Sequence, residues 1–223
     1  ADYSQIELRV LAHLSEDPAM VAAFRADQDI HRTVAAQVFG ALPGLVTDAM
    51  RQQAKAVNFG IIYGQTPYGL SRELGIPVGE AKRFIEQYFA RYPRVKSYLD
   101  GIIAGARQDG RVRTMTGRLR PLPDIRSGTP GAIAFAERTA VNTVIQGSAA
   151  DLIKLAMVAI SRELPPEKGR LLLQIHDELI LEVPEKHLDE VTEMIKERME
   201  NILPLRVPLK VNGASGLTWE AIT

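Results

Sequence analysis

The spacing of apolar positions changes along the chain. It is typical of strands at the two ends and of helices in the middle. The first residues, ADYSQIELR, alternate as a strand does and become apolar enough to enter a helix by residue 14. The segments LLLQI, ELILEV and LRVPLKVNG, all in the last quarter of the chain, are again typical of strands. Strands at both ends with helices between them favour an α+β fold with a helical insertion.

Capping residues divide the helical middle into several elements. Several side chains here can accept hydrogen bonds from the first helical N–H groups, and several glycines can end helices. The expected helix starts are Asp17-Pro18, Asp29, Thr47 and Thr66-Pro67, and the expected stops are Gly40, Gly64 and Gly75.

The pattern changes again after residue 78. Two amphipathic helices, EAKRFIEQYFARY and RVKSYLDGIIAGARQ, are expected to break at Pro93, and RVRTMTGRLRPLP predicts an irregular hairpin that turns at Thr116-Gly117. A long helix over about residues 130–161, interrupted near Gly147, precedes the strands of the C-terminal part. EKHLDEVTEMIKERMENI predicts a last helix.

Composition narrows the class of protein without naming a function. The 223 residues carry 27 basic and 27 acidic side chains, so any evidence for nucleic-acid binding must be local. The absence of cysteine excludes disulfides and thiolate metal sites. No run of about 18 apolar residues predicts a membrane span, and the N-terminus has no signal-peptide pattern. It also has no Met, which suggests a piece excised from a longer protein, although a processed native terminus is the alternative.

Two carboxylates stand where the strands are expected to meet. His176-Asp177 occupies the turn between LLLQI and ELILEV, although His-Asp is not a favoured hairpin pair. A solvated turn explains these charges as well as a functional site does. Alternation puts Asp2, Ser4 and Ile6 on one face of the first strand, so Asp2 can approach Asp177 if the strands share a sheet. Such a pair would need a proton or a cation such as Mg²⁺ between its members, but spacing does not prove that they meet.

A stripe of cations and aromatics follows one helix face. Arg51, Lys55, Phe59 and Tyr63 recur every four residues in RQQAKAVNFGIIYG. A polyphosphate could lie on the cationic half while a base or sugar packs on the aromatic half, which is the layout of a nucleoside triphosphate. An exposed basic turn followed by buried core aromatics is the alternative.

Taken together, DYSQIELR, RQQAKAVNFGIIYG and QIHDE resemble the three sequence motifs of the family A (DNA polymerase I type) DNA polymerases. The resemblance covers the chain from the first palm motif onward, and it implies that the early palm, the thumb and any exonuclease domains lie elsewhere. It implies an antiparallel palm sheet with packed helices and a mostly helical fingers insertion. The expected division is palm for residues 1–14, fingers for 15–129 and palm again for 130–223.

The resemblance assigns the catalytic motif residues. Asp2 and Asp177 match the two aspartates that hold two Mg²⁺ ions, with Mn²⁺ as an alternative, and the Tyr3 carbonyl matches a further metal ligand. His176 matches a residue near the primer terminus. Glu178 matches one that assists the site without being a strict ligand.

It also assigns the nucleotide-binding residues. Glu7 matches the residue that crowds the sugar 2′ position, and Gln5 and Ile6 line the same region. Arg51 and Lys55 match the triphosphate-binding pair, with a catalytic contribution from Lys55. The remaining matches are Phe59, which packs on the incoming sugar and base, Tyr63, which stacks near the templating base and pairs with the glutamate, and His31, near the triphosphate.

Two further patterns fit binding of a DNA duplex. Arg138, Asn142 and Gln146 form a polar stripe on an apolar helix, and the resemblance places such residues along the primer–template minor groove; satisfied core amides are the alternative. Six arginines between residues 107 and 126 face only two aspartates, which suits phosphate contacts, although such runs are more often solvated.

The expected function is therefore template-directed addition of deoxynucleotides to a primer 3′-OH, in replication or repair, by two-metal-ion nucleotidyl transfer. The resemblance implies primer–template DNA and deoxynucleoside triphosphates as partners, together with the missing thumb and exonuclease portions. It implies a monomeric, cytoplasmic, nucleoid-associated protein of bacterial or phage type without a membrane partner. A catalytically silent nucleic-acid-binding fragment is the main alternative. A metal-dependent phosphohydrolase is a weaker one, because a hydrolase does not need the base-stacking helix face.

Overall fold

The computed structural model describes residues 1–127 and 129–222, and its chain forms two compact units. One unit combines residues 1–10 with 148–223, and the other is the continuous segment 11–147. Helices α1 and α8 each contribute residues to both units.

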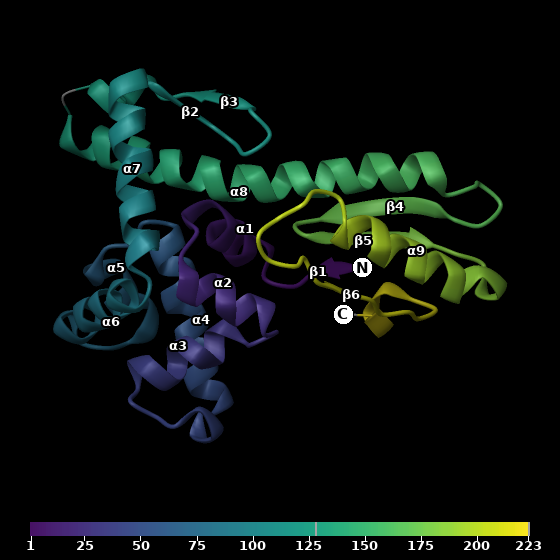
Figure 1. Ribbon diagram of the computed structural model, residues 1–223, viewed down its shortest axis with the longest axis horizontal. Coiled ribbons are helices and arrows are strands. Elements are labelled where there is room, and N and C mark those ends of the chain that lie inside the picture. Colours follow the sequence, from purple (N-terminus) through teal and green to yellow (C-terminus); the bar gives the residue numbers. More distant parts are fainter. Residues whose placement is uncertain (128, 223) are drawn as a thin grey trace. The chain divides into compact units, whose positions relative to one another are not determined.

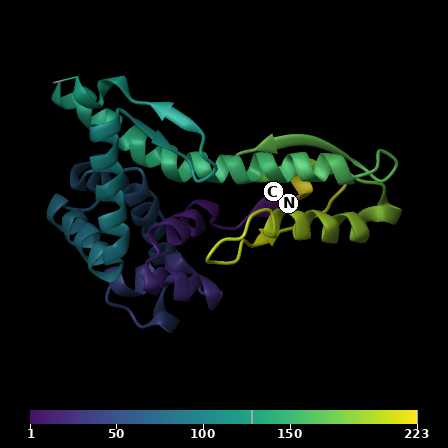
Figure 2. The same cartoon turned by 45° about the horizontal axis from the view of Figure 1, so that its top comes forward.

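The first unit contains the four-stranded antiparallel sheet, in the order β4-β5-β1-β6. The strands at the two ends of the sequence therefore pair with each other, as an α+β fold requires. The sheet strands are β1 (Asp2–Tyr3), β4 (Arg170–Ile175), β5 (Glu178–Glu182) and β6 (Val211–Asn212). Helix α9 (Leu188–Glu200) follows β5 after the short 3₁₀ turn η3 (Glu185–His187), and η4 (Trp219–Ile222) lies near the C-terminus. In two views β4 runs beside the C-terminal half of α8 (Figures 1 and 2).

Two expectations about these strands are wrong in extent. Alternation continues only to Tyr3, because Gln5 adopts a left-handed backbone with φ of 54° and α1 begins at Ile6. The predicted strand in LRVPLKVNG shrinks to two residues, since Pro208 has no N–H to give to a ladder.

The second unit is built mainly from helices. The described helices that lie within it are α2 (Pro18–Arg25), α3 (Ile30–Val38), α4 (Asp48–Ile62), α5 (Pro67–Leu74), α6 (Val78–Arg91) and α7 (Pro93–Asp109), with the 3₁₀ turns η1 (Pro43–Leu45) and η2 (Pro123–Arg126). The shared helices are α1 (Ile6–Ser15) and α8 (Pro130–Glu163). The predicted hairpin forms as β2 (Arg111–Arg113) and β3 (Leu119–Pro121), with Gly117 at positive φ in its turn.

Capping explains why these helices begin where the sequence predicts. Asp17, Asp29, Thr47 and Thr66 each accept hydrogen bonds from N–H groups in the first turn of the helix that follows. Asp17 is fully buried and also accepts a 3.1 Å hydrogen bond from the backbone N–H of Arg94, so one side chain joins the starts of α2 and α7.

Helix α8 is continuous, so the expected interruption near Gly147 is wrong. Gly147 instead allows close packing, since a Cβ there would lie 2.8 Å from Cγ2 of Thr114. By length and composition α8 could cross a membrane, with a mean hydropathy of 1.4 over its best 18-residue window. Of that window, 56% is buried inside the structure, so much of its apolar surface packs against the rest of the chain.

Candidate functional site

Strand pairing brings the two aspartates of the first unit onto neighbouring strands. Asp2 of β1 is in register with Glu178 of β5, and the backbone N–H of Tyr3 donates to the carbonyl of Asp177 at 3.2 Å. The return bond, from the Leu179 N–H to the Ala1 carbonyl, is 2.8 Å long. The antiparallel ladder therefore holds Asp2 beside Asp177 and Glu178, although 174 residues separate Asp2 from the turn in sequence.

This crowding changes the electrostatics of Asp2. Burial, followed by the negative charges of Asp177 and Glu178, raises the pKa of Asp2 to about 6, while the N-terminal ammonium acts in the opposite direction. The ionised form of Asp2 is therefore destabilised by its surroundings, and a cation placed between the carboxylates would reverse that effect.

The oxygen ligands available around Asp2 and Asp177 suit Mg²⁺ better than a metal ion whose ligands all come from the protein. Among the described residues, no group of three or more acidic or histidine side chains could hold an ion. Mg²⁺ commonly takes one or two carboxylates and completes its shell with water and phosphate oxygens. The buried Tyr3 hydroxyl donates to the carbonyl of Met199 at 2.7 Å, so only the backbone carbonyl of Tyr3 could serve as the ligand that the resemblance implies.

The backbone on either side of the carboxylates is tightly constrained. His176, in the β4–β5 turn, has a positive φ of 51°, which side chains other than glycine seldom adopt. The His176 carbonyl accepts a 2.6 Å bond from the Gln174 side chain. After β1, the Ser4 N–H donates to the carbonyl of Lys210 at 2.8 Å. The guanidinium of Arg9 then donates to the carbonyl of Ser4 at 2.8 Å, so both turns are anchored by hydrogen bonds.

The residues that follow this turn form the start of α1. Ile6 is buried, while Glu7 is half-buried in the first turn of the helix. The side-chain oxygen Oε1 of Gln5 is buried without a hydrogen-bond partner among the described residues. Gln5, Ile6 and Glu7 thus lie within five residues of Asp2, with Gln5 in a left-handed turn and Ile6 and Glu7 in the first turn of α1, rather than on strand faces.

Helix α4 of the second unit presents the predicted stripe. The Arg51 Nε atom donates to Oδ2 of Asp29 at 2.6 Å, and the Lys55 Nζ atom lies 5.9 Å from the centroid of the Phe59 ring. The rings of Phe59 and Tyr63 stack with centroids 5.9 Å apart and an interplanar angle of 24°. Cations followed by stacked aromatics therefore occur in the predicted order.

Two neighbours of this stripe were not identified from the sequence. Asp29 was expected only to cap α3, but its second oxygen binds Arg51; the pKa of Asp29 lies below its usual value because hydrogen bonds from Arg51 and Arg32 outweigh the effect of burial. Asn58 is fully buried and contacts His31, whose ring centroid lies 5.9 Å from that of Phe59. No spacing rule could reveal either contact, because the partners lie on different helices.

The polar stripe on α8 is partly accessible. Arg138 and Gln146 are exposed, and the guanidinium of Arg138 lies 6.0 Å from the ring centroid of Phe135. Oδ1 of Asn142 is buried without a hydrogen-bond partner in the described part of the chain. The simple alternative of satisfied core amides therefore does not describe Asn142.

Most of the clustered arginines make contacts within the second unit. Arg107 pairs with Glu137, and Arg126 donates to the carbonyls of Arg107 and Gln108. Arg118 and Arg120 donate to Gly147 and Thr143 of α8, respectively. These bonds attach the hairpin and η2 to neighbouring helices, so the cluster has a structural role whether or not it also meets phosphates.

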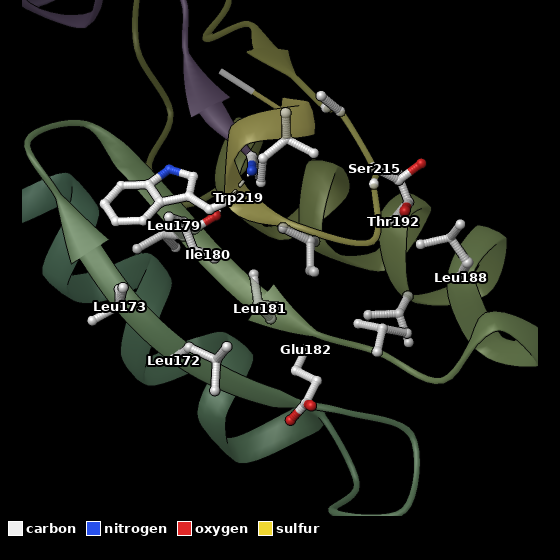
Figure 3. Close-up of a pocket in the computed structure, with 18 of the residues that line it drawn as sticks. Leu172, Leu173, Leu179, Ile180, Leu181, Glu182, Leu188, Thr192, Ser215 and Trp219 are labelled. Atoms are coloured by element: carbon white, nitrogen blue, oxygen red, sulfur yellow. Dashed lines mark hydrogen bonds between the residues drawn. The ribbon is translucent and has the colours of Figure 1, made fainter.

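A separate apolar pocket of about 440 Å³ lies in the first unit. Figure 3 shows Leu172 and Leu173 of β4, Leu181 of β5 and Trp219 around it. Its lining is mainly aliphatic and lacks paired carboxylates, so it does not provide the chemistry of the Asp2 and Asp177 site.

Sequence similarity over nearly the whole chain shows the family to which it belongs. The family model of DNA polymerase family A matches residues 1–221. This chain belongs to DNA polymerase family A.

Curated members of family A cover nearly the whole chain. DNA polymerase I of Geobacillus stearothermophilus is 53% identical over 221 residues, which are 98% of this chain and 25% of that protein. The Bacillus subtilis enzyme is 50% identical with the same coverage, and the thermostable DNA polymerase I of Thermus filiformis is 49% identical over 98% of this chain and 26% of its own. The chain thus spans about a quarter of the length of these family A relatives.

A solved structure supports the fold of this family A chain. The POL domain of Pol1 from M. smegmatis, in complex with DNA primer-template and dNTP, superposes with a TM-score of 0.95 at 42% identity. The match covers 99% of this chain and 39% of that one. The α+β assignment made from the hydrophobic pattern is therefore confirmed.

Proposed function

We propose that this segment is the nucleotidyl-transfer core of a template-directed DNA polymerase that extends a primer from its 3′-OH. The observation that carries the proposal is the pairing of Asp2 with β5, which sets its carboxyl beside Asp177. Burial, followed by the charges of Asp177 and Glu178, raises the pKa of Asp2 to about 6. Membership of family A and the DNA- and dNTP-bound state of the M. smegmatis POL domain support the same substrates here.

In the proposed reaction the primer 3′ oxygen attacks the α-phosphorus of a deoxynucleoside triphosphate. A phosphodiester bond forms, the bond to pyrophosphate breaks, and the hydroxyl proton passes to solvent. Asp2 and Asp177, with the Tyr3 carbonyl, would hold two Mg²⁺ ions, or Mn²⁺ as a substitute. Bound there, the ions would activate the 3′ oxygen and neutralise charge on the leaving pyrophosphate.

Side chains of α4 bind and orient the nucleotide in this proposal. Arg51 and Lys55 carry the charge of the triphosphate, and Lys55 supports the charge that develops on the leaving group. Phe59 packs on the incoming sugar and base, while Tyr63 stacks near the templating base. The Asp29 carboxylate, which is bonded to Arg51, sets the direction of that guanidinium before the substrate arrives.

The remaining motif residues select the sugar and hold the duplex. Glu7, with Gln5 and Ile6, crowds the sugar 2′ position. Four residues contact primer–template DNA: Arg138, Asn142, Gln146 and His176. The minor-groove contacts test base-pair geometry without reading sequence, because that groove presents similar acceptors for every pair. Glu178 adds negative charge beside the metal ligands.

Primer extension tests the catalytic assignment. In a full-length polymerase that carries this segment, Asp2→Ala and Asp177→Ala should each lose most nucleotide incorporation because each removes a metal ligand. Glu193→Ala, which removes an exposed carboxylate of α9, is the matched control and should retain activity. Near-normal incorporation by either aspartate variant would contradict the proposal.

Metal binding can be measured without DNA or the rest of the enzyme. Mn²⁺ added to the 223-residue chain should give a bound electron paramagnetic resonance signal that Mg²⁺ displaces. Asp177→Asn should weaken this binding, whereas Glu193→Ala should not. Equal binding by all three proteins would contradict a metal site at the paired aspartates.

One observation supports the alternative of a catalytically silent binding fragment: the chain spans only about a quarter of the length of its relatives. Primer extension by the chain alone is compared with extension by the same chain joined to the preceding part of a relative. Extension only in the joined protein indicates a catalytic core that needs its missing parts. Duplex binding without extension in either protein favours the silent fragment.

A further inference from the structure

The side-chain amide of Asn58 is buried against His31 on α4, the helix that carries the proposed nucleotide-binding residues. Asn58 is 0% exposed and lies on α4, one residue before Phe59. Its Nδ2 atom donates to the carbonyl of Ala54 at 3.0 Å and lies 3.0 Å from Nδ1 of His31. Its Oδ1 atom has no hydrogen-bond partner among the described residues.

The hydrogen-bond geometry determines which way this amide faces. If the amide were reversed, Oδ1 would stand about 3.0 Å from the Ala54 carbonyl, and two acceptors would repel. The Nδ2 atom must therefore face both partners. One of its two hydrogens goes to Ala54, and the other goes to Nδ1 of His31.

An amide hydrogen directed at Nδ1 defines the state of the imidazole. Nδ1 must accept, so it carries no proton, and a neutral ring then carries its hydrogen on Nε2. Burial, together with the charges of Arg51 and Lys55, lowers the pKa of His31 to about 4, although Asp29 opposes this shift. The neutral ring is thus the form expected at neutral pH.

We propose that Asn58 is a positioning residue that holds His31 in the Nε2–H form, so that the ring offers one N–H donor to a phosphate oxygen of a nucleotide bound at Arg51 and Lys55. This inference rests on the proposed function for its substrate. With the opposite tautomer, Nε2 would present a lone pair to a phosphate oxygen and repel it. Asn58 therefore acts on the nucleotide through His31 without contacting it.

The tautomer can be read directly from the 223-residue chain, without activity. Long-range ¹H–¹⁵N correlation spectra distinguish protonated from unprotonated ring nitrogens, and the His31 signals are those among the four histidines that vanish in His31→Gln. We expect unprotonated Nδ1 and protonated Nε2 at pH 7. An Nδ1–H signal for His31 in the unaltered chain would overturn the proposal.

Asn58→Asp tests the cause of the tautomer. A carboxylate can only accept, so Nδ1 of His31 should become protonated in this variant. Asn201→Asp is the matched control, because the Asn201 amide also donates to the carbonyl four residues earlier, that of Glu197, at 2.9 Å. It should leave the His31 spectrum unchanged. An unaltered Nδ1 signal in folded Asn58→Asp would also overturn the proposal.

Steady-state kinetics in the full-length polymerase test the link to the nucleotide. Asn58→Asp should raise KM for the deoxynucleotide about tenfold or more, the loss expected for one charge-assisted hydrogen bond, with a smaller change in kcat. In the His31→Gln background the same substitution should add little further. An equal rise in both backgrounds, or none in either, would show that Asn58 does not act through His31.

These outcomes separate the inference from the proposed function. If the unaltered full-length enzyme incorporates no nucleotide, the proposed function fails before any variant is made. The tautomer measurements still decide how Asn58 and His31 interact.

Discussion

At the residue scale, Asp2 illustrates how a position proposed to bind metal can oppose stability. Its carboxyl is half-buried beside Asp177 and Glu178, and the ladder prevents it from moving away. The raised pKa of Asp2 records the free energy needed to ionise it in the folded chain. A cation bound between the carboxylates would offset the free-energy cost of ionising Asp2.

The sign of the pH dependence follows from this shift. The pKa of Asp2 rises from 3.8 when unfolded to about 6 when folded, so the unfolded chain releases this proton first as pH rises. Stability attributable to Asp2 is therefore highest below pH 4 and falls between pH 4 and 6. Asp2→Asn should remove this loss and stabilise the metal-free chain at pH 7.

The expected gain for Asp2→Asn is about 1 kcal/mol at pH 7, because the full conversion of about 3 kcal/mol must be discounted for solvent screening of a half-exposed group. Urea unfolding at pH 4 and pH 7 measures it. The difference between Asp2→Asn and the unaltered chain should be larger at pH 7. The assignment is contradicted if the difference in unfolding free energy between Asp2→Asn and the unaltered chain is no larger at pH 7 than at pH 4.

At the element scale, helix starts and close helix contacts depend on a few small groups. Asp17 is fully buried, caps α2 through Ala19 and Met20, and accepts a bond from Arg94. Gly147 brings α8 close to the hairpin that carries Thr114. Single substitutions at these positions should therefore cost more than the same changes on exposed helices.

Replacing the Asp17 cap should destabilise the chain by about 2 kcal/mol or more. Asp17→Ala leaves the buried N–H groups of α2 and α7 without their acceptor. Thr66→Ala removes an exposed cap of α5 and should cost about 0.5–1 kcal/mol. Chemical unfolding of both variants provides the comparison, and equal losses would show that burial of Asp17 does not matter.

The same glycine-to-alanine change should have opposite effects in two helices. In α8, Gly147→Ala places a methyl group 2.8 Å from Thr114 Cγ2, and such overpacking costs about 1–3 kcal/mol. In α7, Gly105→Ala meets nothing within 4 Å and should stabilise by about 0.5–1 kcal/mol through helix propensity. Thermal unfolding separates the two effects. A stabilised Gly147→Ala variant would contradict the packing described for α8.

At the scale of the whole molecule, the two compact units divide the proposed chemistry. The unit of residues 1–10 and 148–223 holds Asp2 and Asp177, whereas residues 11–147 hold α4 with the stripe that we propose binds the nucleotide. The palm and fingers boundaries expected at residues 14 and 129 stay a prediction, and the boundaries between the two compact units fall at residues 10 and 147.

The continuous unit should fold by itself. A chain of residues 11–147 retains the core of Ala106, Val112, Leu122 and their neighbours on α8, together with the buried helices α2–α6. We expect a helical circular dichroism spectrum and one cooperative thermal transition. The full chain under the same conditions is the control, and a gradual transition without a midpoint would contradict the division.

Local chemistry in the sequence determined the element order of this protein. Cap residues, proline starts and glycine stops act within about four residues, so Asp17, Thr47 and Gly75 could be interpreted without a structure. The four-residue spacing on α4 likewise depends on helix geometry alone. The sequence motifs were sufficient for the family because they are long and ordered, and the family match confirmed them.

Only the tertiary structure decided which distant groups meet. The pairing of Asp2 with Glu178, the bond between Asp29 and Arg51, and the contact of Asn58 with His31 each join different elements. Backbone conformation also decided the length of the first strand. The alternating pattern predicted a longer strand, but the positive φ at Gln5 ends it after two residues. The physical reason is that spacing determines which face of an element a residue occupies, whereas packing of the folded chain determines what that face contacts.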